Sequence, residues 1–100
     1  MIQNLHDALQ YQKDSIISKS LLKNSAGNIT FFAFDKDQSL SEHTAPFDAF
    51  IICVEGNLSI TIDKNVYVLS QNDSIVLPSH IPHSVYATSQ SKFVLTMLKA

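Results

Sequence analysis

The sequence predicts an all-β domain, a sandwich or barrel of short antiparallel strands. Apolar segments of strand length recur about every eight to twelve residues, with polar turns between them. Period-two alternation is clearest in residues 58–63, where leucine and isoleucine alternate with serine, threonine and aspartate. The chain has only two glycines and no glycine-rich phosphate loop. These features favour a closed or sandwiched antiparallel fold.

Length and composition indicate one domain. A hundred residues are too few for two separate cores, and 45% hydrophobic with 16% charged residues is typical of a folded globule. We expect an N-terminal segment over residues 1–12 and a β-barrel over residues 15–99.

Charge and hydropathy argue against nucleic acid and against a membrane as partners. The net charge is -2, and the seven basic residues are scattered lysines, so no basic stripe predicts nucleic-acid binding. The longest apolar run, residues 49–54, is far shorter than a membrane span. Residues 1–10 lack the features of a secretory signal, and the single Cys53 allows no internal disulfide. We therefore expect a reducing, cytoplasmic setting.

The N-terminus carries the one helical pattern. Asn4 can cap a helix, Asp7 lies near its positive end, and Leu5 and Leu9 share a face, which predicts one or two turns. His6 has no chemical neighbours in the sequence and is expected to be a lone surface residue. The polar residues 35–44 predict a long loop along a rim. The expected strands are residues 15–22, 29–34, 48–55, 58–63, 66–68, 74–77, 83–87 and 92–99.

Two histidine-containing runs give the strongest functional signal. The first begins at His43 and continues through residues 44–49, and a Glu-Gly pair closes it at residues 55–56. The second runs from Pro78 to His83. Each histidine lies at the edge of an apolar strand pattern, about forty residues from the other. A β-barrel can bring both imidazoles to one pocket.

These runs resemble the two motifs of the cupin superfamily, within it the small single-domain cupins with a type-2-like conserved barrel. Residues 32–49 and 54–56 are similar to the first motif, and residues 73–83 to the second. The resemblance covers most of residues 15–99. It implies a double-stranded β-helix, or jelly-roll barrel, preceded here by a short N-terminal helical turn.

The resemblance also implies a metal site, but this chain keeps only two of the four family ligands. His43 and His83 match two family ligands, whereas Ala45 stands for the second histidine and Ala49 for the glutamate. Two imidazoles alone would hold a divalent ion weakly and at low occupancy, because protein sites normally supply three or more ligands. Candidates for a third ligand are Glu42, His80, which stands where the family has a glycine, Cys53 and, as a weaker candidate, Asp48.

A small-molecule pocket is the second implication. With Ala45 and Ala49 facing inward, strand alternation sends Ile51 and Cys53 inward as well. The expected lining of a pocket for a small polar or anionic ligand is His43, His83, Ala45, Phe47, Ala49 and Ile51. Neighbouring side chains could equally fill this space, and an imidazole at a strand edge is often only hydrogen-bonded to a backbone carbonyl. Cys53 is expected to be a buried hydrophobe with a protonated thiol.

The same alternation turns Phe50, Ile52 and Val54 outward, so this strand is apolar on both faces. Something must cover the outer face, and we expect a second copy in a homodimer. Coverage by residues 1–22 is the alternative.

Three functions remain open. The leading one is a binding module for a small ligand with a weak metal site. The second is a metal-dependent enzyme, an oxygenase or isomerase, and the third is a ligand-free dimerisation domain. The sequence assigns no catalytic residue, because no third group completes a serine-histidine arrangement.

Overall fold

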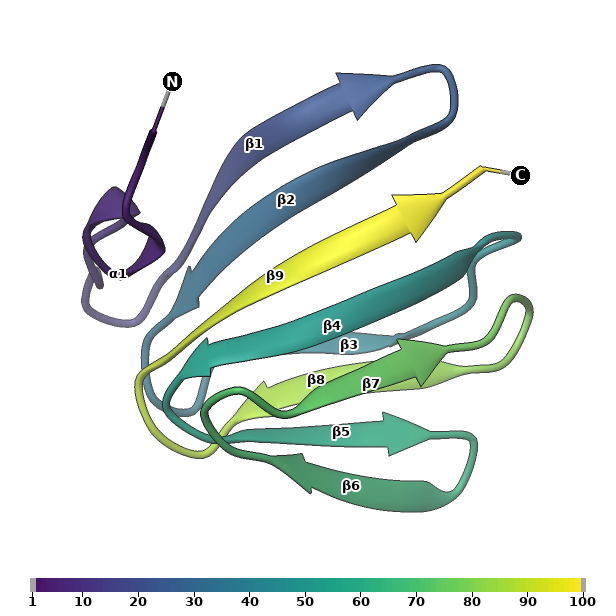
Figure 1. The fold of residues 1–100 in the computed structure, drawn as a ribbon. Helices are drawn as coiled ribbons and strands as arrows, with labels where there is room; N and C mark the ends of the chain where they lie inside the picture. Colours follow the sequence, from purple (N-terminus) through teal and green to yellow (C-terminus); the bar gives the residue numbers. More distant parts are fainter. Residues whose placement is uncertain (1, 100) are drawn as a thin grey trace.

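The computed structural model describes residues 2–99, which form two facing antiparallel β-sheets and one turn of helix (Figure 1). This confirms the predicted all-β jelly-roll fold. The elements are α1 (Leu5–Ala8), β1 (Ile16–Asn24), β2 (Gly27–Phe34), β3 (Ser39–His43), β4 (Asp48–Glu55), β5 (Leu58–Ile62), β6 (Asn65–Leu69), β7 (Ser74–Leu77), β8 (His83–Ala87) and β9 (Ser91–Leu98).

The strand order interleaves the two halves of the chain. The larger sheet runs β1-β2-β9-β4-β7 and the smaller one β3-β8-β5-β6. The last strand, β9, therefore lies between β2 and β4 and joins the ends of the chain into one sheet (Figure 1). Strands β3 and β8, which carry His43 and His83, are neighbours in the smaller sheet. No helix within residues 2–99 is long and apolar enough to cross a membrane.

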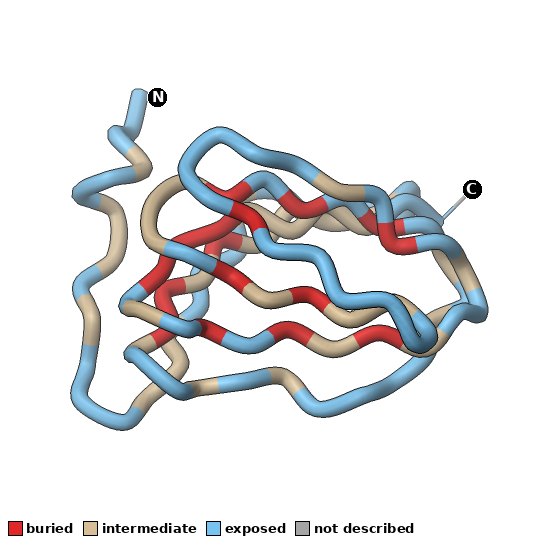
Figure 2. Tube along the Cα trace, turned by 90° about the horizontal axis from the view of Figure 1, so that it is seen from below, coloured by how far each residue is buried: buried red, intermediate tan, exposed pale blue. Residues whose placement is uncertain are grey.

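The core fills the space between the sheets. In β4 the burial alternates as predicted: Ala49, Ile51 and Cys53 are buried, while Phe50 and Ile52 remain exposed. An aromatic cluster completes the core, because the rings of Phe32 and Phe93 stack with their centroids 5.0 Å apart and Phe34 meets Phe93 edge to face. Figure 2 shows the same alternation as buried positions spaced along the strands, with exposed loops at the ends.

The prediction of a loop over residues 35–44 is wrong in part. Residues 39–43 form strand β3, which pairs antiparallel with β8 at the edge of the smaller sheet. Leu40 is the one apolar residue in this strand, so its sequence lacks the alternation of a half-buried strand. Pairing with β8 decides its conformation, as tertiary context often does for β-structure.

A β-bulge ends strand β4. Its pairing with β9 shifts register between Cys53, which lies opposite Phe93, and Glu55, which lies opposite Lys92. A bulge adds a residue to one strand and re-aims the side chains that follow. Strict alternation would turn Glu55 inward with Cys53. The bulge instead places it beside Lys92, at the end of the sheet that the N-terminal segment approaches.

Candidate functional site

The site is built from one cross-strand pair. His43 on β3 and His83 on β8 are register partners, so their side chains leave neighbouring strands on the same face. The two Nε2 atoms are 3.1 Å apart, and the rings meet edge to face with centroids 4.4 Å apart and an interplanar angle of 72°. The fold therefore brings together two imidazoles that are forty residues apart.

Backbone carbonyls fix the tautomer of both rings. Nδ1 of His43 is 2.8 Å from the carbonyl oxygen of Ser41, and Nδ1 of His83 is 3.2 Å from that of Ile81. A carbonyl can only accept, so each Nδ1 carries the proton and donates it. In a neutral imidazole the Nε2 then holds a lone pair. When both rings are neutral, the two Nε2 atoms therefore face each other as acceptors, and a proton or a cation between them would satisfy both.

The environment of the pair is apolar. His83 is buried, with 6% of its surface exposed, whereas His43 lies at the rim. Burial lowers the pKa of His83, and charge on His43 lowers it further, which outweighs the hydrogen bond to Ile81. Burial thus favours the neutral form of the His83 ring. The pair opens onto a cavity of about 30 Å³ lined by Leu40, His43, Ala45, Ala49, Ile51, Leu77, His83, Val85, Phe93, Leu95 and Met97.

The structure brings most of the predicted pocket residues to this cavity. Ala45, Ala49 and Ile51 line it together with the two histidines. Phe47 is half-buried and lies outside the lining. The space beside the two alanines is small, and Leu95 and Met97 also line it. A cavity of this size holds an ion or one or two waters.

The cavity lining contains none of the four candidate third ligands. Glu42 and His80 are exposed and do not line the cavity. Within residues 2–99 no three side chains of histidine, cysteine, aspartate or glutamate converge on one point. Cys53 is buried, and burial together with the carboxylates of Asp73 and Glu55 raises its pKa to about 11. Its thiol stays protonated, as the sequence predicts.

The loop before His83 holds His80 in a backbone conformation that glycine adopts more easily. His80 adopts a left-handed backbone conformation with φ of 65°, and its N–H donates to the carbonyl oxygen of Ala45 over 2.7 Å. Asp48 accepts from the N–H of Ser79 and holds the same loop against β4. Glycine adopts this φ without steric strain, whereas a side chain with Cβ does so at a cost. The position therefore favours the glycine that the cupin pattern has there.

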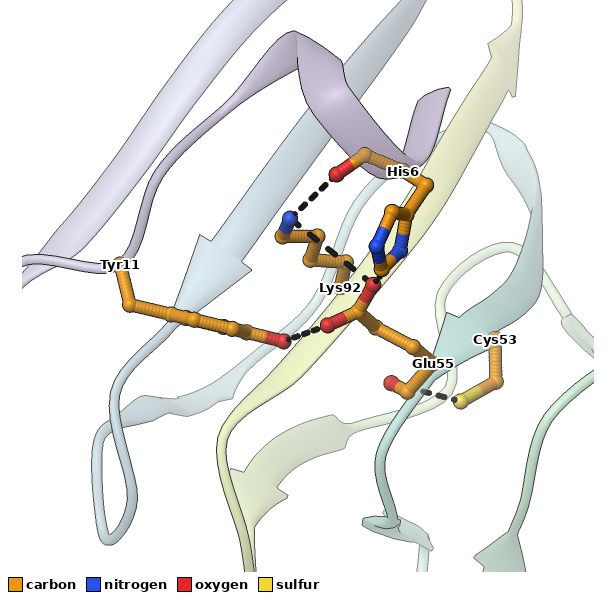
Figure 3. A network of polar contacts seen from close by, with 5 residues as sticks. All are labelled: His6, Tyr11, Cys53, Glu55 and Lys92. Carbon is orange, nitrogen blue, oxygen red and sulfur yellow. Dashed lines mark hydrogen bonds and ion pairs between the residues drawn. The ribbon is translucent and has the colours of Figure 1, made fainter. Parts of the chain in front are cut away.

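A second polar cluster was not found from the sequence. Glu55 accepts hydrogen bonds from Tyr11 over 2.6 Å and pairs with His6 over 2.7 Å, and the ammonium of Lys92 lies 3.8 Å away (Figure 3). The expectation that His6 lacks partners is thus wrong, although its side chain is 75% exposed. The bulge that aims Glu55 at this cluster depends on strand register, which no local pattern in the sequence reveals.

Comparison with known proteins places this geometry in a family. The profile of the cupin domain matches residues 30–99. A conserved protein of unknown function from Streptococcus pyogenes is similar at 30% identity with a TM-score of 0.94, covering 100% of this chain and 88% of that one. A cupin 2 conserved barrel domain protein from Leptotrichia buccalis is similar at 33% identity with a TM-score of 0.92, covering 97% of this chain and 47% of that one.

A more distant structure shows the same fold. A cupin superfamily protein from Desulfitobacterium hafniense is 22% identical, with a TM-score of 0.87 over 90% of this chain and 83% of that one. The search of curated proteins gave no match. The cupin profile spans more than half of the residues, including both histidines and the strands that carry them. The chain belongs to the cupin domain family.

Proposed function

We propose that this protein is a small binding module that takes a polar or anionic ligand at the His43–His83 pair, with a weakly held divalent cation between the imidazoles. The observation that carries the proposal is the 3.1 Å approach of the two Nε2 atoms, whose rings are both oriented through Nδ1. Two lone pairs at this distance repel unless a proton or a cation lies between them. A divalent cation satisfies both.

The residues present fit such an ion. Each imidazole donates its Nδ1 proton to a carbonyl, which is the second-shell arrangement that orients metal-binding histidines. Two nitrogens each about 2.1 Å from an ion lie roughly 3.0 Å apart at a 90° angle and roughly 3.4 Å apart at the tetrahedral angle, so the 3.1 Å separation falls within the range of adjacent ligands. When bound, the ion would supply positive charge to a ligand oxygen. The chain itself would orient the imidazoles and exclude water with its apolar walls.

Binding is favoured over turnover because the cavity offers few chemical groups. Apart from the two imidazoles, its lining consists of aliphatic and aromatic side chains and two alanines. No carboxylate is placed there to accept or return a proton. With two protein donors, water or the ligand must complete the coordination of an ion. This suits a small ligand that presents an oxygen to the imidazoles.

Calorimetric titration of the untagged protein with Zn²⁺ tests the proposal. We expect measurable binding that weakens by roughly tenfold or more in His43→Ala and in His83→Ala, since even second-shell changes weaken metal sites by that factor. His6→Ala is the matched control, because it removes an exposed histidine outside the pair. Zinc affinity equal in the wild type and in the double variant His43→Ala/His83→Ala would overturn the proposal.

We further propose a homodimer through the outer face of the larger sheet. Phe50 and Ile52 on β4 and Val76 on β7 form a neighbouring apolar group, with exposed fractions of 36%, 38% and 55%. We call these three residues the outer strip. Grouped apolar side chains of this kind are typical of protein–protein contacts. The N-terminal segment reaches the other end of this sheet, at Glu55 and Lys92, and leaves the strip exposed.

A further inference from the structure

Residues 2–14, which we call the N-terminal strap, run beside the larger sheet at the end where β1 begins and β2 ends (Figure 1). Gln3 accepts a hydrogen bond from the ammonium of Lys19, which is the register partner of Phe31. The carbonyl of His6 accepts from the ammonium of Lys92, the partner of Ala33. The strap therefore crosses the rows of Phe31 and Ala33 in succession.

Two apolar side chains in these rows, those of Phe31 and Ala33, are completely covered. Phe31 and Ala33 are 0% exposed, yet neither belongs to the core cluster between the sheets. They alternate along β2 with Phe32 and Phe34, which pack into that core. Phe31 and Ala33 thus face outward, and the strap is the segment that lies over their rows. Without the strap this end of the face would be exposed.

The strap has little internal structure to hold it in place. Helix α1 is one turn of four residues, without a side-chain capping bond and without a buried residue. Helices this short are not stable alone, so tertiary contacts must hold the strap. Figure 2 shows the segment running outside the barrel with no buried position.

The principal tie is a single carboxylate. Both oxygens of Glu55 are engaged, one by the Tyr11 hydroxyl and one by His6, so two strap residues share one anchor on β4 (Figure 3). Lys92 adds a second contact, because its ammonium donates to the His6 carbonyl over 2.6 Å and lies 5.0 Å from the centre of the Tyr11 ring. Lys92 is only 4% exposed, so the strap shields its ammonium.

The other end of the strap is fixed to the barrel. Asp14 has a left-handed φ of 57°, and its N–H donates to the carboxylate of Asp35 over 2.7 Å. The N–H of Ser15 donates to the carbonyl of Gln12, which closes a tight turn before β1. These bonds mark the end of the strap, and the pairing of β1 with β2 begins just after them, at Ile16.

We propose that the strap is a detachable cover and that Glu55 is its latch. While the Glu55 carboxylate holds Tyr11 and His6, the strap hides the Phe31 and Ala33 rows and the Lys92 ammonium. When the latch opens, the strap swings about the turn at residues 12–15, and Lys92 becomes accessible while the barrel stays folded. The contacts of the Glu55 carboxylate would thus decide whether this end of the outer face is exposed.

Acylation of lysines by acetic anhydride, read residue by residue by mass spectrometry, tests the latch. We expect Lys92 to react roughly tenfold faster or more in Glu55→Gln than in the wild type, because a hydrogen bond to a charged group contributes about that factor. The exposed Lys99 provides the internal reference rate. Glu42→Gln is the matched control, since Glu42 is exposed on β3 and has no hydrogen bond to the strap.

Hydrogen exchange of the same variants completes the test. Amides of β4 and β9 should keep their protection in Glu55→Gln, because the barrel stays folded when the strap moves. Unchanged Lys92 reactivity with an intact barrel would overturn the proposal, and so would simultaneous loss of protection in β4 and β9. If Glu55→Gln does not fold, the double variant His6→Ala/Tyr11→Phe opens the latch from the strap side, and equal Lys92 protection there would overturn it.

Discussion

The Nε2 atoms of His43 and His83 lie 3.1 Å apart across a β3–β8 register pair, and both rings are oriented by backbone carbonyls. Because each carbonyl comes from the residue two positions earlier in the chain, Ser41 in β3 and Ile81 in the loop before β8, the orientation is local to each run. The fold contributes only the pairing of the two strands. The pair is therefore preorganised without help from the two alanines that stand at the other ligand positions of the family pattern.

Restoring those positions should strengthen metal binding. Ala45 and Ala49 both line the cavity, so Ala45→His/Ala49→Glu adds an imidazole and a carboxylate beside the existing pair. We expect zinc affinity to rise by roughly a hundredfold or more, since four ligands saturate a tetrahedral site. Calorimetry measures the affinity. Ala45→His/Ala49→Gln is the matched control, and an equal gain in that variant would contradict a role for the carboxylate.

The metal-free form of that variant should be less stable. The cavity is about 30 Å³, so larger side chains overpack it and lower the free energy of unfolding by about 1–3 kcal/mol. Urea unfolding with and without Zn²⁺ measures this, and saturating zinc should recover the loss by mass action.

Much of this site follows from local pattern, and the rest depends on register. Alternation in β4 predicts which faces Ala49 and Phe50 take, because side-chain direction is a property of each strand alone. Strand β3 was missed because a polar edge strand carries no such signal. The direction of Glu55 was missed because a one-residue bulge, set by pairing with β9, reverses the face. Sequence spacing alone cannot show that shift.

Substitution of His80 separates backbone strain from metal binding. With φ of 65°, His80→Gly should raise the free energy of unfolding by about 0.5–1 kcal/mol, the relief of left-handed strain less the extra freedom of glycine in the unfolded chain. Urea denaturation measures it. Zinc affinity should stay unchanged, because the His80 side chain is exposed and outside the cavity. A clear drop in zinc affinity would instead identify His80 as a ligand.

The Glu55 cluster predicts a pH-dependent contribution to stability. Burial raises the pKa of Glu55, but hydrogen bonds from Tyr11 and His6 and the charge of Lys92 outweigh it, so the folded-state pKa lies below the ordinary 4.5. A depressed carboxyl pKa stabilises the fold above the unfolded value, and this stability is lost as the pH falls through the folded value. Glu55→Gln should therefore lower the free energy of unfolding by about 1–2 kcal/mol at pH 7.

That difference between wild type and Glu55→Gln should stay constant from pH 7 down to about 5 and shrink below 4.5. Urea unfolding at a series of pH values measures it. Asp63→Asn is a suitable control, because Asp63 is an exposed turn residue at the far end of β5. A difference that persists unchanged at pH 3 would show that shape, and not charge, makes Glu55 stabilising.

The outer strip predicts the oligomeric state. Ile52 lies at the centre of the face, paired with Val94 on one side and Ser74 on the other, so a lysine there places a charge within any contact between two copies. We expect light scattering to give the wild type twice the chain mass of 11.1 kDa at micromolar concentration, and Ile52→Lys one chain mass.

Thr61→Lys, on the outer face of the smaller sheet, is the matched control and should remain dimeric. A wild type with the mass of one chain would contradict the dimer, and a monomeric Thr61→Lys would move the interface to the other sheet. Because burial of Phe50 and Ile52 would stabilise the pair, dissociation on dilution should also lower the unfolding midpoint of the wild type but not of Ile52→Lys.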